Sequence, residues 1–256
     1  MAEGMDEQGV TAEQLDEYAA AYYLKVDASP DLFIEERLQQ HVIKLIADRL
    51  SQDDNVLEMG FGTGVVAPAL VERGFKIEVL EGSPALCARA REVLPGIPVH
   101  ESLFEDFRAD RIYDVVLCLF TLEHVDDPAT VVRTAARWLK PDGLLIASVP
   151  NAGSVHREVA VLMGIQASAA DLSERDVLVG HQRVFSRPEL EEAVKSAHLE
   201  VDFVWGSFLK VVPNSLMLQW APELIDALCI VSERLPPDAC ANIVVGARLP
   251  ASLAHD

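Results

Sequence analysis

The segment EMGFGTGVV (58–66) is rich in glycine and carries one acid, a combination suited to binding a small cofactor. Gly60, Gly62 and Gly64 let backbone amides approach a ligand closely, and the helix expected next favours a negative group at its N-terminus. A pyrophosphate and an amino-acid carboxylate are both candidates. A dinucleotide site needs G-x-G-x-x-G, whereas here the third glycine comes one place early and Glu58 stands ahead of the loop. That carboxylate would repel a pyrophosphate but attract an ammonium group.

The elements around this loop alternate between short apolar runs and segments of helical period. The runs predicted as strands are 55–60, 75–83, 97–102, 113–120, 143–151, 199–205 and 242–249. Helical segments of about 10–15 residues separate the first five, which indicates right-handed crossovers and a parallel sheet. We therefore predict an α/β, Rossmann-like doubly wound fold. Its sheet has seven strands, mostly parallel with the last one antiparallel, and N-terminal helices and a small helical lid are added to it.

The chain is expected to divide into three parts with different roles. Residues 1–34 are predicted as an N-terminal helical cap, with helices over 11–26 and from about Ser29 to Leu50. Residues 35–150 form the cofactor-binding core, and 151–256 hold the acceptor-side insertions and the final strands of the same domain. The segments 1–34, 151–185 and 206–241 are long enough to enclose a small molecule, and the last of them could also serve a homodimer.

Composition narrows the possible partners. The 256 residues carry a formal net charge of −20, which argues against a protein that grips phosphate backbones. No apolar run approaches the ~20 residues needed to cross a bilayer, and the acidic N-terminus has no signal-peptide character. The four cysteines show no metal-ligand spacing. We expect a cytoplasmic protein with a small-molecule acceptor and with neither a nucleic-acid nor a membrane partner.

The sequence E-x-G-x-G-x-G resembles motif I of the class I S-adenosylmethionine-dependent methyltransferases, in their small-molecule (natural-product or ubiquinone-type) branch. EVLEGS, VHESLFEDF, DVVLCLFTLEHVDDP and WLKPDGLLIASVPN are similar to the family's later motifs and follow in the same order, over roughly residues 35–150. The resemblance implies S-adenosyl-L-methionine as methyl donor. The residues that it assigns to this cofactor are Glu58, Gly60, Gly62, Gly64, Glu81, Ser102, Leu103, Phe104, Leu119 and Tyr23.

Particular roles follow from this resemblance. Glu81 would take both ribose hydroxyls, as a carboxylate can accept two hydrogen bonds at once. Ser102, Leu103 and Phe104 would line the adenine, and Leu119 would offer backbone contacts to the methionine part. An N-terminal helix often folds over the cofactor in this family, and Tyr23 is the residue of that helix that we expect to close the cofactor site.

Methyl transfer requires an acceptor that has lost its proton, so a base is needed for a hydroxyl and a deprotonated form for an amine. His181 and His124 are the predicted catalytic residues. In ubiquinone-type relatives an E-x-x-E-H arrangement holds a metal, but Phe120 stands in place of the first glutamate, so no metal is expected. A purely local packing role is the alternative for His124. His156, on an inserted helix, is expected to face solvent.

The acceptor is the least determined part. An acidic surface suits an amine-bearing acceptor. The leading hypothesis is therefore N- or O-methylation of an amino sugar or other secondary-metabolite intermediate, as in antibiotic biosynthesis. A phenolic or quinone-type O-methylation, and a non-catalytic cofactor-binding regulator, are the alternatives. A nicotinamide-dependent oxidoreductase is disfavoured by the glycine spacing. Lys210, Asn214 and Asp176 could line the acceptor cavity or be solvated.

Overall fold

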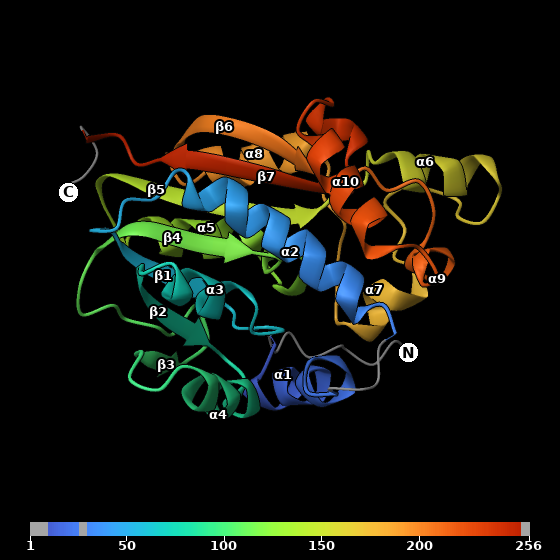
Figure 1. Cartoon of the computed structure of the whole chain (residues 1–256). Coiled ribbons are helices and arrows are strands. Elements are labelled where there is room, and N and C mark those ends of the chain that lie inside the picture. Colours follow the sequence, from blue (N-terminus) through green and yellow to red (C-terminus); the bar gives the residue numbers. More distant parts are fainter. Residues whose placement is uncertain (1–9, 26–29, 252–256) are drawn as a thin grey trace, which may run out of the picture.

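The computed structural model describes residues 10–25 and 30–251, which form one seven-stranded sheet with helices on both faces (Figure 1). The strand order is β3-β2-β1-β4-β5-β7-β6. The strands are β1 (Asn55–Met59), β2 (Lys76–Glu81), β3 (Val99–Glu101), β4 (Tyr113–Leu119), β5 (Leu139–Pro150), β6 (Glu200–Ser207) and β7 (Asn242–Arg248). Only β7 runs antiparallel to its neighbours, β5 and β6. The predicted fold class, with its antiparallel last strand, is confirmed.

Helices precede β1, connect most of the successive strands and lie in the segments that join β5 to β6 and β6 to β7. They are α1 (Ala12–Tyr18), the π-helix η1 (Ala19–Tyr23), α2 (Leu32–Ala47), α3 (Val66–Glu72), α4 (Pro84–Val93), the 3-10 helix η2 (Leu122–His124), α5 (Pro128–Ala136), α6 (Val155–Leu162), α7 (Glu174–Leu178), α8 (Arg187–Lys195), α9 (Asn214–Met217), α10 (Pro222–Ser232) and the 3-10 helix η3 (Pro237–Ala239). No helix in the described part of the chain is long and apolar enough to span a membrane.

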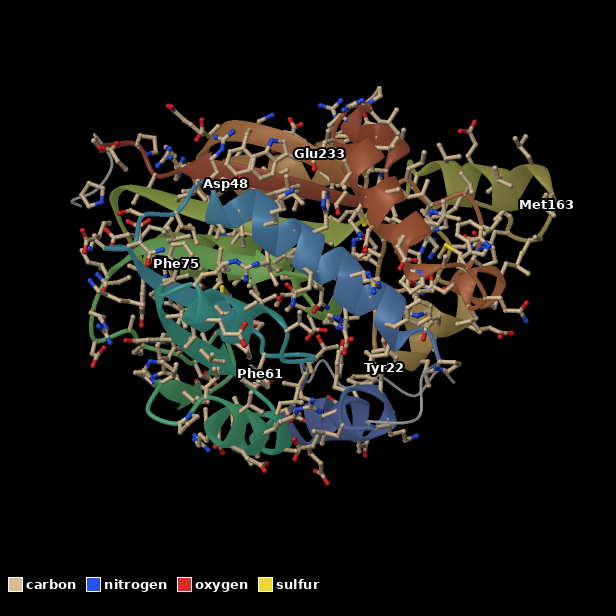
Figure 2. All side chains as sticks on the ribbon, in the orientation of Figure 1. Tyr22, Asp48, Phe61, Phe75, Met163 and Glu233 are labelled. Carbon is tan, nitrogen blue, oxygen red and sulfur yellow. The ribbon has the colours of Figure 1, made fainter. Side chains whose placement is uncertain are left out.

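Two apolar layers hold the sheet between its helices. On one face, side chains of α5 and α8 such as Val131 and Leu190 pack on the strands. On the other face, α2, α3 and α4 supply the layer, with Ile43 and Leu70 fully buried. A third, smaller cluster joins the start of α2 to α9 and α10. Figure 2 shows Met163 at the outer tip of the segment that follows α6, far from these layers.

Local signals explain where the site-bearing helices begin. Ser83 accepts a hydrogen bond from the Leu86 backbone N–H and Pro84 occupies the first turn of α4, which fixes the turn after β2. Ser173 and Asp176 form a capping box at the start of α7. These caps therefore fix the residues at which α4 and α7 begin.

Two predicted helices differ from the structure. The helix predicted over 11–26 is α-helical only to Tyr18 and then widens into η1, and Val26 lies outside the described residues, as does Ser29. The helical segment predicted between the strands 113–120 and 143–151, at residues 127–140, ends at Ala136, because Leu139 already pairs with Tyr113 as the start of β5. The predicted bounds of the cap, core and acceptor-side region stay predictions, and so do the homodimer and the cytoplasmic location.

Candidate active site

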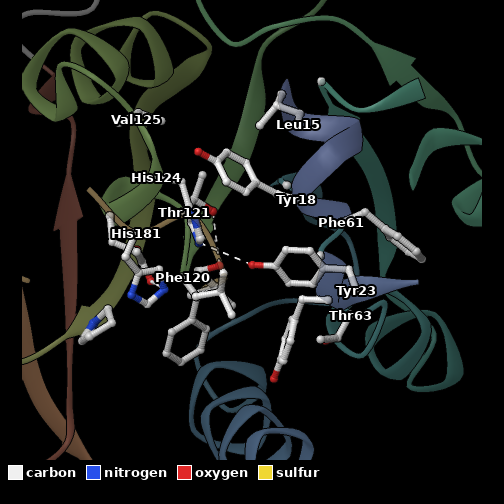
Figure 3. Close-up of a pocket in the computed structure, with 18 of the residues that line it drawn as sticks. Leu15, Tyr18, Tyr23, Phe61, Thr63, Phe120, Thr121, His124, Val125 and His181 are labelled. Carbon is white, nitrogen blue, oxygen red and sulfur yellow. Dashed lines mark hydrogen bonds and ion pairs between the residues drawn. The ribbon is translucent and has the colours of Figure 1, made fainter. Parts of the chain in front are cut away.

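A cavity of about 770 Å³ lies at the carboxyl ends of the strands, where ligands of open α/β sheets bind. The turns after β1, β2 and β4 line one end of it, and α6, α7 and the segment after β6 line the other. Residues of the N-terminal helices α1 and η1, including Leu15, Tyr18 and Tyr23, also line it, and in Figure 3 the side chains of Tyr18 and Tyr23 point toward Thr121 and His124. We call the first end the donor half and the second the acceptor half.

The donor half depends on a left-handed backbone conformation that only glycine adopts easily. Gly60, Gly62 and Gly64 all have positive φ, at 84°, 51° and 74°. A Cβ at Gly64 would also meet the Phe61 ring at 2.7 Å, so the loop is closed against this side chain. A side chain at any of the three positions would strain the turn after β1.

Two buried acids face this turn. Glu81 accepts hydrogen bonds from the backbone N–H groups of Phe61 (2.8 Å) and Ser83 (2.7 Å). Burial raises the pKa of Glu81, against these hydrogen bonds, and burial together with the Glu81 charge raises the pKa of Glu58 well above its usual range. The Glu58 Oε2 atom has no hydrogen-bond partner among the described residues. Two neighbouring buried carboxylates fit a ligand that brings an ammonium group and hydroxyl donors, as S-adenosylmethionine does.

The cavity brings together most of the residues that the resemblance assigns to the cofactor. Those lining it are Glu58, Gly60, Gly62, Glu81, Leu103, Phe104, Leu119 and Tyr23. Gly64 and Ser102 are not among the lining residues. Gly64 closes the turn from the other side, and the Ser102 hydroxyl donates to the backbone carbonyl of Leu103 at 2.9 Å.

The N-terminal cap is tied to both halves. Asp16 accepts hydrogen bonds from the Ser83 hydroxyl and, at 3.0 Å, from the Ala85 backbone N–H at the start of α4. The Tyr23 hydroxyl lies 3.5 Å from His124 Nε2, the contact drawn as a dashed line in Figure 3. A Cβ at Gly62 would stand 3.9 Å from the Tyr23 ring, so this ring also touches the glycine loop. The predicted cap residue Tyr23 is thus placed where the two halves meet.

His181 is held in one orientation in the acceptor half. Its Nδ1 lies 3.0 Å from Asp176 Oδ1, and because a carboxylate only accepts, Nδ1 carries the proton and Nε2 is left as the acceptor. Asp176 also accepts from Ser173 and, at 2.8 Å, from Arg157 Nη2. Although burial opposes ionisation, the hydrogen bonds from His181 and Ser173 and the Arg157 charge lower the pKa of Asp176. His181 lines the cavity, so its basic nitrogen belongs to a histidine–carboxylate pair of the kind that general bases use.

Glu123 and His124 lie beside this pair. Glu123 is fully buried and neither carboxylate oxygen has a hydrogen-bond partner among the described residues; its nearer oxygen is 3.9 Å from His181 Nε2. Burial raises the pKa of Glu123 to about 7, opposed by the His181 charge. His124 donates from Nδ1 to the Gly180 carbonyl at 3.2 Å, and burial, then His181, lower its pKa to about 3. His124 is therefore a neutral imidazole packed edge-on to His181, with ring centroids 4.7 Å apart.

Glu123, His124 and His181 each place one ligand atom within 4.8 Å of the others. Both histidines have Nδ1 engaged, by Gly180 and by Asp176, which is the arrangement that orients imidazole ligands. These three side chains could hold a divalent cation, although the resemblance expected an acid where Phe120 stands. The expected absence of a metal stays a prediction.

One sequence-based expectation about the acceptor half is wrong. His156 does not face solvent: it lines the cavity, and burial, reinforced by the charges of Lys210 and Arg157, lowers its pKa to about 3. The reason is that α6 begins close after the end of β5, so His156 and Arg157 of its first turn line the cavity while the rest of the helix projects away from the sheet (Figure 1). Lys210 also lines the cavity, whereas Asn214 donates to Asp31 (2.8 Å) and does not.

Sequence reasoning missed Arg157, Arg175 and Asn242, which all line the cavity. Arg175 binds Asp31 at 2.8 Å and the Tyr22 hydroxyl at 2.7 Å, which connects α7 to the cap. The Ser-x-x-Asp capping pattern at Ser173 predicts a helix start and could have identified α7. No local pattern marks Asn242, because its position depends on the antiparallel pairing of β7.

Known proteins with similar sequences are methyltransferases. A family model described as a methyltransferase domain matches residues 32–203. The ubiquinone biosynthesis O-methyltransferase of Xylella fastidiosa is 30% identical over 190 residues, 71% of this chain and 75% of that protein. The one from Sodalis glossinidius is 36% identical over 103 residues, and this match spans only 38% of this chain and 41% of the relative.

A solved structure from Thermotoga maritima shows the same fold. It is described as a SAM-dependent methyltransferase and possible histamine N-methyltransferase. It superposes with a TM-score of 0.61 at 21% identity, over 93% of this chain and 96% of that one. At this identity the likeness concerns the fold, so the acceptor has to be argued from the cavity itself.

Proposed function

The chain belongs to the methyltransferase-domain family and is an S-adenosylmethionine-dependent methyltransferase, and on that premise we propose that it methylates a hydroxyl oxygen of a small phenolic or quinol-type acceptor. The observation that carries this proposal is the His181–Asp176 pair, which engages Nδ1 and leaves Nε2, 3.9 Å from Glu123, without a hydrogen bond among the described residues. A phenolic hydroxyl needs such a base as its oxygen attacks.

The chain's own residues have distinct tasks in this reaction. When bound, S-adenosylmethionine supplies a methyl group whose bond to sulfur breaks with both electrons going to sulfur. Glu58 and Glu81 hold the donor, and the glycine loop admits it closely. His181 Nε2 takes the proton of the acceptor hydroxyl while the new carbon–oxygen bond forms. Asp176 accepts from Nδ1 throughout and stabilises the imidazolium that results.

The character of the acceptor half favours a neutral ring over an ammonium. Phe120, Tyr22 and Tyr23 give it aromatic walls, and Lys210 lines it as a cation without an ion pair among the described residues, whereas Arg157 and Arg175 are each paired with carboxylates. An ammonium-bearing amino sugar would meet the Lys210 ammonium, so the amine expected from the acidic surface has less support. The name of the Xylella fastidiosa relative agrees with an oxygen acceptor.

The test uses two acceptors of the same shape. Catechol and 1,2-phenylenediamine are each incubated with the protein and S-adenosylmethionine, with and without EDTA because of the Glu123–His124–His181 group, and products are identified by mass spectrometry. We expect O-methylated catechol and little N-methylated diamine. N-methylation with no O-methyl product would overturn the proposal. Tight S-adenosylhomocysteine binding without turnover of any acceptor would instead support the regulator alternative.

A further inference from the structure

Three polar side chains line the acceptor half away from the glycine loop, Lys210, His156 and Asn242, and the charge of Lys210 acts on His156. They come from the segment after β6, the first turn of α6 and the first residue of β7. The antiparallel direction of β7 brings its start to the carboxyl edge, where Asn242 pairs with Ser207 at the end of β6 and with Pro150 at the end of β5. The Ala241 N–H donates to the Phe208 carbonyl at 2.8 Å, which fixes the segment carrying Lys210 beside β7.

Lys210 differs from the other cations of the cavity. Arg157 is paired with Asp176, and Arg175 is paired with Asp31 and Glu35. Within residues 10–25 and 30–251, Lys210 makes neither an ion pair nor a hydrogen bond. Glu35 is the acid whose charge acts on it most, but that carboxylate already binds Arg175 at 3.2 Å and Asn214 at 2.9 Å. Burial lowers the pKa of Lys210 to about 8, the direction expected of an ammonium without a close counter-charge.

The two neighbours of Lys210 also have unused polar atoms. Asn242 is only 7% exposed, and its Nδ2 has no hydrogen-bond partner among the described residues. The Nδ1 atom of His156 is buried and equally without a partner. Leaving a buried donor unpaired costs about 1–3 kcal/mol. A ligand that accepts hydrogen bonds and carries negative charge would relieve all three groups at once.

We propose that Lys210 and Asn242, with His156 beside them, form a subsite for a carboxylate carried by the acceptor. This inference rests on the proposed function and narrows its substrate class to hydroxylated aromatic acids. A single ammonium with neutral donors matches one negative charge, whereas a phosphate dianion would face the nearby carboxylate of Glu35 with Lys210 as the one unpaired cation that the described residues place in the cavity.

The test compares a charged and a neutral probe of equal size. Binding of 3,4-dihydroxybenzoate and of 3,4-dihydroxybenzamide to the protein saturated with S-adenosylhomocysteine is measured by calorimetry. We expect the carboxylate to bind roughly 10–100-fold more tightly, as a charge-assisted hydrogen bond would give. Lys210→Met should remove this preference while leaving the affinity for the amide nearly unchanged, and Lys210→Arg should retain most of it.

Controls separate this inference from the proposed function. Lys195→Met, on the exposed face of α8, should keep the preference. If Lys210→Met does not fold, Asn242→Asp tests the same subsite, because an added negative charge should weaken binding of the carboxylate only. Equal affinities for the two probes in the unmodified protein, including no binding of either, would overturn the subsite. Loss of the O-methyl product from catechol would instead count against the proposed function.

Discussion

The donor and acceptor halves of the cavity are built on different principles. In the donor half, Phe61, Glu81 and Ser83 belong to consecutive elements, and the contacts among them are backbone N–H groups pointing at one carboxylate. In the acceptor half, His181 is oriented by Asp176, and Asp176 by Arg157 from another helix. The first depends on torsion angles that only glycine adopts easily, the second on side chains that orient one another.

The donor half should tolerate fewer substitutions than the acceptor half. A backbone site at the end of β1 can bind only ligands that suit its fixed N–H directions, so the donor is constrained by the fold itself. The acceptor half draws on α6, α7 and the segment after β6, which carry few sheet contacts and can exchange residues without disturbing the core. Substitutions in the two halves should therefore affect different measured quantities.

The largest expected effect is that of His181→Ala on turnover. Removing the base should lower kcat by roughly 10²–10³-fold, because the acceptor hydroxyl loses the group that takes its proton. Affinity for S-adenosylhomocysteine, measured by calorimetry, should stay the same, since no donor-half contact involves His181. His198→Asn is the matched control: His198 is exposed at the end of α8 with a φ of 59°, a conformation that asparagine tolerates. Unchanged turnover in a folded His181→Ala variant would make this histidine structural.

The second largest expected effect is that of Glu123→Gln on the pH dependence of the free energy of unfolding. The pKa of Glu123 is about 7 in the folded protein against 4.5 as its usual value, so the folded state binds this proton more tightly than the unfolded state. Stability contributed by the neutral carboxyl is fully present below pH ~4.5 and is lost as pH rises toward 7. The variant has no such loss, so its stability relative to the unmodified protein should grow by up to ~3 kcal/mol between pH 4.5 and 8.

Chemical denaturation at several pH values measures this difference. Glu105→Gln, at an exposed residue of the same cavity rim, is the matched control. Parallel curves for the Glu123→Gln variant and the unmodified protein would mean that Glu123 ionises normally in the fold, as it would beside a bound cation.

The two halves also differ in how far they can be predicted from the sequence. The glycine loop, Glu81 and the alternation of strands and helices are local patterns, and the sheet they predict is the one observed. The pairing of Asp176 with His181 depends on a short helix, α7, and the place of His156 in the cavity depends on where α6 begins after β5. Asn242 reaches the cavity through strand pairing with β5. Contacts of this kind join residues distant in sequence, and periodicity carries no information about them.

Glu81→Ala tests the donor half by the same logic. We expect a loss of roughly 1.5–3 kcal/mol in S-adenosylmethionine affinity, because a charge-assisted hydrogen bond to the ribose is removed. Turnover at saturating donor should fall much less, in contrast to His181→Ala. The matched control is Glu72→Ala, an exposed acid at the end of α3 on the other side of the loop. An unchanged donor affinity would remove Glu81 from the site, and the backbone of the loop would then carry the binding alone.

The smallest expected effect belongs to Tyr23, whose ring lies by Gly62 and whose hydroxyl reaches His124. At 3.5 Å this hydrogen bond is long, so Tyr23→Phe should change turnover by only a few-fold, less than ~1 kcal/mol. Donor affinity should not change, because the ring that contacts the glycine loop is kept. Tyr18→Phe, whose side chain is partly exposed, serves as the control. If Tyr23→Phe weakened donor binding and left turnover intact, the hydroxyl would belong to the donor half, and the cap would not connect the two halves through His124.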